Sequence, residues 1–124
     1  MNKPQALNAF WESFGLDAYD STIVLPENTP YPRISYDSAT GAIGDILNLS
    51  ASLWYRSSGW AEIETKTAEI GDALPEGSSY IIKIDGGYMR IMRGRPFAQR
   101  VGDPDDPGIR RMIINIQVEF LTAT

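Results

Sequence analysis

A long alternating segment near the C-terminus constrains the fold more than any other part of this chain. Its apolar side chains are Met112, Ile114, Ile116, Val118 and Phe120, and between them stand Ile113, Asn115, Gln117 and Glu119. Successive side chains of a strand point to opposite faces, so a period of two predicts a half-buried strand. Its length, about ten residues, exceeds the usual five or six and lets it cross a whole sheet.

A hairpin precedes this strand. The turn Asp85-Gly86-Gly87 joins two apolar runs, residues 79–84 and 88–92, and its glycines can adopt the positive φ that a tight turn requires. Four spaced arginines lie on and after the hairpin, and the loop Gly102-Asp-Pro-Asp-Asp-Pro-Gly108 follows them. The C-terminal third is therefore expected to be hairpin, loop and long strand.

A second alternating segment covers residues 47–55. Leu47, Leu49, Ala51, Leu53 and Tyr55 occupy one face, and Asn48, Ser50 and Ser52 occupy the other. This pattern predicts another half-buried strand. Shorter strands are predicted at Ser21–Leu25 and Arg33–Tyr36, within a proline-rich and turn-rich region. Residues 26–44 are expected to form a long exposed flap.

Two helices are predicted from apolar residues at helical spacing. The first carries Leu7, Phe10, Trp11 and Phe14, behind Pro4 and before Gly15. The second carries Trp60, Ile63, Thr67, Ile70 and Leu74, with Ser57 and Ser58 as candidate caps and with Pro75 and Gly77 as its end. No regular strand–helix–strand alternation connects these elements. We therefore expect an α+β fold, a mainly antiparallel sheet with two helices packed on one face, in a single domain over residues 1–124.

Composition narrows the functional classes. A chain of 124 residues, 43% of them hydrophobic, can bury one core but is too short for two ordinary domains. Cysteine and histidine are both absent, which removes thiolate chemistry, the commonest zinc ligand and the usual proton-transfer group. There is no apolar run of about 18 residues, and the N-terminus lacks a secretory h-region. We expect assembly in a cytoplasm.

Charge is distributed unevenly. Residues 1–88 hold five Lys or Arg against twelve Asp or Glu, net −7, whereas residues 89–124 hold six against four, net +2. The two parts could attract one another on neighbouring copies. The overall charge of −5 argues against nonspecific nucleic-acid binding, which draws affinity from a basic surface.

Four segments carry a resemblance to a known class of protein. They are Ala51-Ser-Leu-Trp-Tyr-Arg-Ser-Ser-Gly-Trp60, Gly87-Tyr-Met-Arg-Ile-Met-Arg-Gly-Arg-Pro-Phe-Ala-Gln99, Gly102-Asp-Pro-Asp-Asp106 and Arg111-Met-Ile-Ile-Asn-Ile-Gln-Val-Glu-Phe-Leu121. They resemble the small minor structural proteins of tailed phages and prophages of Gram-positive bacteria. Within that group the chain is most similar to the tail-terminator, or tail-completion, type of phages with long non-contractile tails. The resemblance covers roughly residues 33–121.

This resemblance implies a non-enzymatic virion protein, assembled in the bacterial host cytoplasm. Such a subunit typically forms a ring of six at the end of the tail tube, stops tube polymerisation and presents a joining surface to the head. The implied partners are further copies of the chain, the tail-tube protein and the head–tail connector protein. The resemblance implies no catalytic residue, cofactor or metal, no specific nucleic-acid sequence and no membrane.

Candidate interface residues follow from the need of a ring for two different, complementary patches on each copy. The basic candidates are Arg90, Arg93, Arg95 and Arg100, and the acidic candidates are Asp103, Asp105 and Asp106. Arginine can bind a carboxylate through two parallel hydrogen bonds. Tyr31, Arg33 and Tyr36 of the flap are candidate contacts to the tube or its channel. For the two tyrosines the alternative is packing on the sheet, which the strand-like sequence favours more for Tyr36 than for Tyr31. The alternative is a solvated face whose ion pairs contribute about 0–1 kcal/mol each.

Other functions remain open at this stage. Another position in the virion, such as a head-completion or minor capsid subunit, is the nearest alternative. A carbohydrate- or peptide-binding module could use Trp54, Tyr55 and Trp60, although aromatic packing in the core is their ordinary role. A small hydrolase or isomerase could use Glu62 and Asp85 as a carboxylate pair.

Two motifs resemble known ligand sites, but each lacks residues or structure that the site requires. The acidic loop opens like an EF-hand, but Pro107 replaces a calcium ligand and Ile114 stands where the bidentate Glu is required. The pair Gly86-Gly87 lacks the following helix N-terminus of a phosphate-binding loop, so a turn is the better interpretation.

Overall fold

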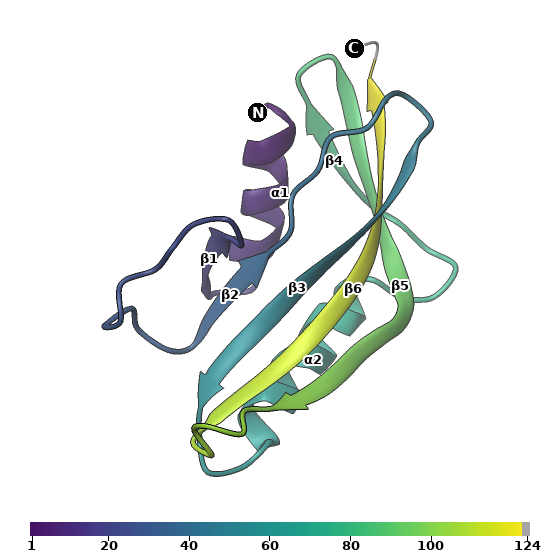
Figure 1. The fold of residues 1–124 in the computed structure, drawn as a ribbon. Helices are drawn as coiled ribbons and strands as arrows, with labels where there is room; N and C mark the ends of the chain where they lie inside the picture. Colours follow the sequence, from purple (N-terminus) through teal and green to yellow (C-terminus); the bar gives the residue numbers. More distant parts are fainter. Residues whose placement is uncertain (123–124) are drawn as a thin grey trace.

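A computed structural model describes residues 1–122 as one α+β domain (Figure 1). Its elements are α1 (Lys3–Glu12), β1 (Asp17–Asp20), β2 (Arg33–Tyr36), β3 (Ile46–Arg56), α2 (Ala61–Ala73), β4 (Tyr80–Ile84), β5 (Gly87–Gly102) and β6 (Ile109–Thr122). The strands form one sheet in the order β1-β2-β3-β6-β5-β4. β1 and β2 are parallel, and every other neighbouring pair is antiparallel. The predicted fold class is confirmed.

The two long alternating segments form the centre of the sheet. β3 and β6 pair over eleven residues, from Ile46 opposite Glu119 to Arg56 opposite Ile109. Their inward residues alternate with polar or half-buried ones along both strands. β6 has 14 residues and extends the predicted alternation at both ends, since it begins at Ile109 and continues to Thr122.

Both helices cover the same face of this sheet. From α1 the core receives Ala6, Leu7, Phe10 and Trp11, and from α2 it receives Ile63 and Ile70. These side chains pack in one cluster with the inward residues of the strands, which include Leu53, Ile91, Ile114 and Phe120. The expected placement of two helices on one face is confirmed. Within residues 1–122, no helix covers the other face of the sheet. Neither helix of the described chain is long and apolar enough to cross a membrane.

The N-terminal helix is held by capping and by one polar contact to the sheet. Asn2 and Gln5 form a reciprocal capping box, each side chain accepting the other's backbone N–H. Asn8 donates to the Tyr36 hydroxyl at 2.8 Å and to the Ala18 carbonyl at 3.3 Å. Tyr36 packs on the sheet with 6% of its surface exposed, so the packing alternative holds for this residue.

Two local predictions were wrong. The strand expected at Ser21–Leu25 lies earlier, at Asp17–Asp20, because the Asp20 carboxylate accepts the Thr22 N–H and hydroxyl and turns the chain there. The helix expected to begin at Ser57 or Ser58 begins after Trp60, which makes no side-chain capping bond. The Ser57 hydroxyl accepts the Gly59 N–H instead, and this short turn replaces the cap.

β5 extends far beyond the hairpin arm that the sequence predicts. It runs for 16 residues, and its pairing with β6 shifts between Arg93 and Ala98. Asn115 of β6 donates to the Pro96 carbonyl at 2.7 Å across this irregularity. A Cβ added to Gly94 would lie 2.6 Å from the backbone of Asn115. The shift therefore brings two backbones so close that only glycine fits.

Substituting Gly94 by alanine tests this close approach. We expect Gly94→Ala to lower the free energy of unfolding by about 1–3 kcal/mol, because the added methyl forces the two strands apart. Gly102→Ala is the matched control in the same strand, where no heavy atom lies within 4 Å of the added Cβ, and it should change stability by less than about 0.5 kcal/mol. Urea unfolding followed by circular dichroism measures both. Equal effects would contradict the close approach.

Candidate assembly surface

The uncovered face of the sheet carries arginine and aromatic side chains in register. One row crosses five strands through Asp17, Arg33, Trp54, Arg111 and Val101. Their neighbours in sequence along β2, β3 and β6 are buried toward the helices, so this row faces the opposite way. We call this side of the sheet the open face.

Trp54 and Arg111 form the centre of that row. The guanidinium of Arg111 lies 4.8 Å from the centre of a Trp54 ring, and its Nε donates to the Ser52 hydroxyl at 3.0 Å. The Trp54 Nε1 donates to the Ser35 hydroxyl at 2.9 Å. Both donors therefore have partners, while the ring and the guanidinium stay half-exposed. Neither residue was among the predicted interface residues, although the alternation of β3 and β6 places both outward.

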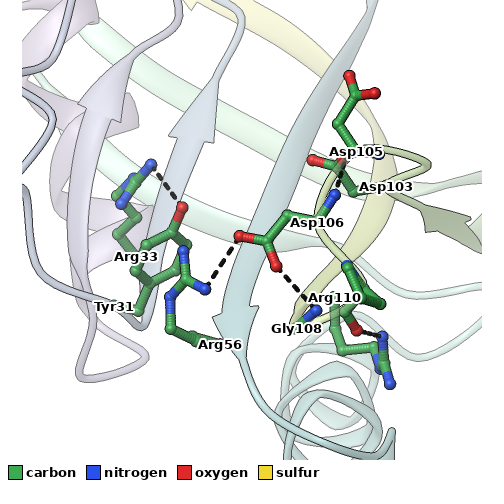
Figure 2. A network of polar contacts seen from close by, with 9 residues as sticks. Tyr31, Arg33, Arg56, Asp103, Asp105, Asp106, Gly108 and Arg110 are labelled. Carbon is green, nitrogen blue, oxygen red and sulfur yellow. Dashed lines mark hydrogen bonds and ion pairs between the residues drawn. The ribbon is translucent and has the colours of Figure 1, made fainter.

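Beside this row, where β2 begins and β3 ends, the flap meets the acidic loop. The guanidinium groups of Arg33 and Arg56 lie 4.2 Å and 5.1 Å from the centre of the Tyr31 ring. Arg33 also donates to the Thr29 carbonyl at 3.0 Å and to the Tyr31 hydroxyl at 3.4 Å. Figure 2 shows Arg56 between Tyr31 and Asp106, with which it forms a 3.0 Å ion pair. The structure thus joins two predicted groups through Arg56, a residue that the sequence did not single out.

The acidic loop is tied mainly to itself. The Asp103 carboxylate accepts the backbone N–H groups of Asp105 and Asp106 at 2.9 Å and 3.2 Å. Asp106 accepts the Gly108 N–H at 2.9 Å and the Arg56 guanidinium at 3.0 Å (Figure 2). The bond from Gly108 and then that from Arg56 lower the pKa of the Asp106 carboxyl. This leaves the Asp105 carboxylate as the exposed acid of the loop, without a partner in the described chain.

Three of the four predicted arginines are engaged within the chain. Arg93 donates to the carbonyls of Leu74 and Gly71 at 2.7 Å and 2.8 Å, and so satisfies orphan carbonyls at the end of α2. Arg90 bonds Ser79 and pairs with Glu119, and Arg100 pairs with Glu64 at 2.7 Å. Arg95 is exposed and has no hydrogen bond or ion pair within the described residues. The interface role of all four remains a prediction.

The alternative sites are separated by the fold. Trp54 lies on the open face, whereas the next residue, Tyr55, is buried under the helices with 6% exposure. Trp60 packs beside the guanidinium groups of Arg100 and Arg110. The three aromatic rings therefore do not form one platform. Glu62 lies in the first turn of α2. Asp85 binds the N-terminal amine from the β4–β5 turn, which lies at the opposite end of the sheet (Figure 1).

The described residues contain no group of three or more acidic side chains placed to hold a metal ion. The Asp103 and Asp106 carboxylates of the acidic loop accept hydrogen bonds from backbone N–H groups and from Arg56. No protein-family model matches this chain, and no curated protein is found to be similar to it.

Arg93 and Arg95 make a matched pair for mutation. We expect Arg93→Met to lower the free energy of unfolding by about 2 kcal/mol, because two carbonyls lose a charged donor and the 4.3 Å contact with the Phe97 ring is weakened. Arg95→Met, two residues along the same strand, should change it by less than about 0.5 kcal/mol. Urea unfolding of both variants measures the difference. If both variants lose a comparable free energy of unfolding, the capping role of Arg93 is wrong.

The Asp106 carboxyl should titrate below an ordinary aspartate. Because its folded pKa is lowered, the bonds that it accepts stabilise the loop above the unfolded pKa and are lost as the pH falls through the folded one. We expect Arg56→Gln to raise the midpoint only partly, since Gly108 still donates. Carboxyl carbon NMR measures the midpoint, with Arg95→Gln as the remote control. A midpoint at or above about 3.9 in the parent chain would contradict the contact.

Proposed function

We propose that this chain is a structural subunit of a phage or prophage virion, of the tail-terminator type. In this proposal six copies close into a ring at the end of the tail tube, stop its polymerisation and offer a joining surface to the head connector. The role is non-enzymatic and belongs to the virion, after assembly in the host cytoplasm. The resemblance of the four segments within residues 51–121 supports the proposal from the sequence.

The observation that carries the proposal in the structure is the open face. A six-stranded sheet is covered on one side only, and the other side presents Trp54, Arg111 and Arg33 in one row. Arginine, tryptophan and tyrosine are the residue types enriched where proteins bind one another strongly. An antiparallel sheet often keeps one face in solvent, but that face is then mostly polar. A row that joins tryptophan to two arginines has the composition of an interaction surface, which supports the role of a subunit.

The contacts that hold the flap and the acidic loop in place also favour the role of an assembly subunit. Subunits that move little on docking lose little conformational freedom, so more of the contact energy remains for assembly. Tyr31 is held between two guanidinium groups, and the acidic loop is joined to β3 by the Arg56–Asp106 pair. The flap and this loop thus offer preformed surfaces to the tube or to the connector.

Light scattering tests the ring. The chain has a mass of 13.7 kDa, so six copies should weigh about 82 kDa, either alone or after mixing with the tail-tube protein of the same phage. The second measurement is tube length by electron microscopy. Tube protein that polymerises with the chain present should give shorter tubes, each with a cap at one end.

The control is the Arg93→Met variant, because its change lies under α2 and leaves the open face intact. Once folded, it should still cap tubes. A chain that remains monomeric with and without tube protein, and leaves tube length unchanged, would exclude the tail-terminator role.

A further inference from the structure

Exposed apolar side chains gather at one end of the open face. Ile46, Ile81, Tyr88 and Leu121 are each between 40% and 61% exposed. Tyr88 stands directly opposite Leu121. A neighbouring row crosses four strands, from Ile46 through Glu119 and Arg90 to Ile81, so that Ile46 and Ile81 are its two ends. We call these four residues the hairpin patch, because they lie beside the β4–β5 turn.

A second group of exposed apolar side chains, a pair, lies beside the β1 edge of the sheet. Ile23 is 56% exposed and Val24 is 93% exposed, immediately after β1. The turn before them is fixed, because Asp20 accepts from the Thr22 N–H, the Thr22 hydroxyl and the Ile23 N–H. We call Ile23 and Val24 the flap patch, because they come just before the flap of residues 26–44. Its exposure is the result of a defined turn, which presents both side chains to solvent.

The two patches cannot meet within one chain. β1 is one edge of the sheet and β4 is the other, with four strands between them. Figure 1 shows the loop after β1 far from the β4–β5 turn. Two different patches at opposite edges are what a head-to-tail contact between copies requires, and repetition of that contact closes a ring if the rotation permits.

Charge complementarity identifies the occupant as a second copy. Around the flap patch, residues 12–32 hold four acidic side chains and no basic one. Beside the hairpin patch, residues 80–92 hold two basic side chains and one acidic, and Lys83, directly opposite Tyr88, has no partner within the described residues. Contact between unlike edges therefore brings opposite charges together, whereas contact between like edges opposes like charges.

We infer that the flap patch of one copy packs against the hairpin patch of the next, and that this contact joins the ring. The inference rests on the proposed function, since it names the surface by which the subunits assemble. Ile23 and Val24 would cover the exposed parts of Ile81, Tyr88 and Leu121. Lys83 would face the acidic side chains beside β1 of the neighbouring copy.

Cysteine cross-linking tests the contact directly, because the natural chain has no cysteine. We would prepare Val24→Cys and Ile81→Cys separately, mix them and oxidise the mixture with copper phenanthroline. The expected result is a disulfide dimer that contains one chain of each kind, with little product from either variant alone. Ala68→Cys, on the exposed side of α2, is the control and should couple poorly with both.

The double variant Val24→Cys/Ile81→Cys should give a ladder of covalent oligomers that ends in one closed species. Its mass reports the number of subunits in the ring. If Val24→Cys chains couple with one another as readily as with Ile81→Cys chains, or if Ala68→Cys couples equally well, the head-to-tail contact is wrong.

Charge substitution gives a second readout that needs no cross-link. Val24→Asp and Ile81→Glu should each weaken self-association at least about tenfold, measured by sedimentation, because each places a carboxylate in the apolar contact. Val24→Leu should associate as the parent chain does. Both positions are exposed in the single chain, so circular dichroism should show an unchanged fold.

The outcomes separate this contact from the proposed function. Rings that cap tubes but are insensitive to Val24→Asp and give no Val24–Ile81 disulfide would overturn the contact and leave the function standing. Rings that form through the disulfide but do not stop tube growth would leave the contact standing and overturn the function. A chain that stays monomeric and gives no disulfide overturns both.

Discussion

The antiparallel pairing of β3 with β6 is the contact on which the other elements depend. Eleven residues of each strand are in register, and this fixes which side chains face the helices. A slip of one residue would send Leu53 and Ile114 to solvent and bring their polar neighbours into the core. Both helices pack on the apolar side that this register creates, and β2 and β5 extend the sheet from its two sides.

The same register assembles the open face. Arg33 and Arg111 are 78 residues apart in the sequence, yet the pairing of β2 and β6 with β3 places them on either side of Trp54. The stack of Arg111 on Trp54 thus follows from the same hydrogen-bond ladder that buries Leu53. The strand ladder and the bonds to Ser35 and Ser52 hold Trp54 and Arg111 in place before any partner binds, which lowers the conformational cost of binding.

Periodicity predicted β3, β6, the hairpin and both helices, because each is encoded by neighbouring residues. It could not predict that β5 continues to Gly102, since Gly94 and Pro96 are typical strand breakers and are tolerated only through the shifted pairing with Asn115. Nor could it predict the partner of Asp106: Arg56 lies 50 residues earlier, and only the sheet brings the two together. Residue type identified a charged surface but not which charges were already paired.

That distinction changes how a ring of these subunits would be held together. Arg93 and Arg100 are bound to α2, so they are not available to a neighbouring copy without loss of the capping bonds or of the Glu64 pair. The charges that remain, such as Arg95 and Asp105, are exposed, and exposed pairs contribute little energy while they steer orientation. Apolar contacts must then supply most of the affinity. The hairpin patch lies at one end of the sheet and reaches its β4 edge, and the flap patch follows the opposite edge strand, β1, so a head-to-tail neighbour could cover both.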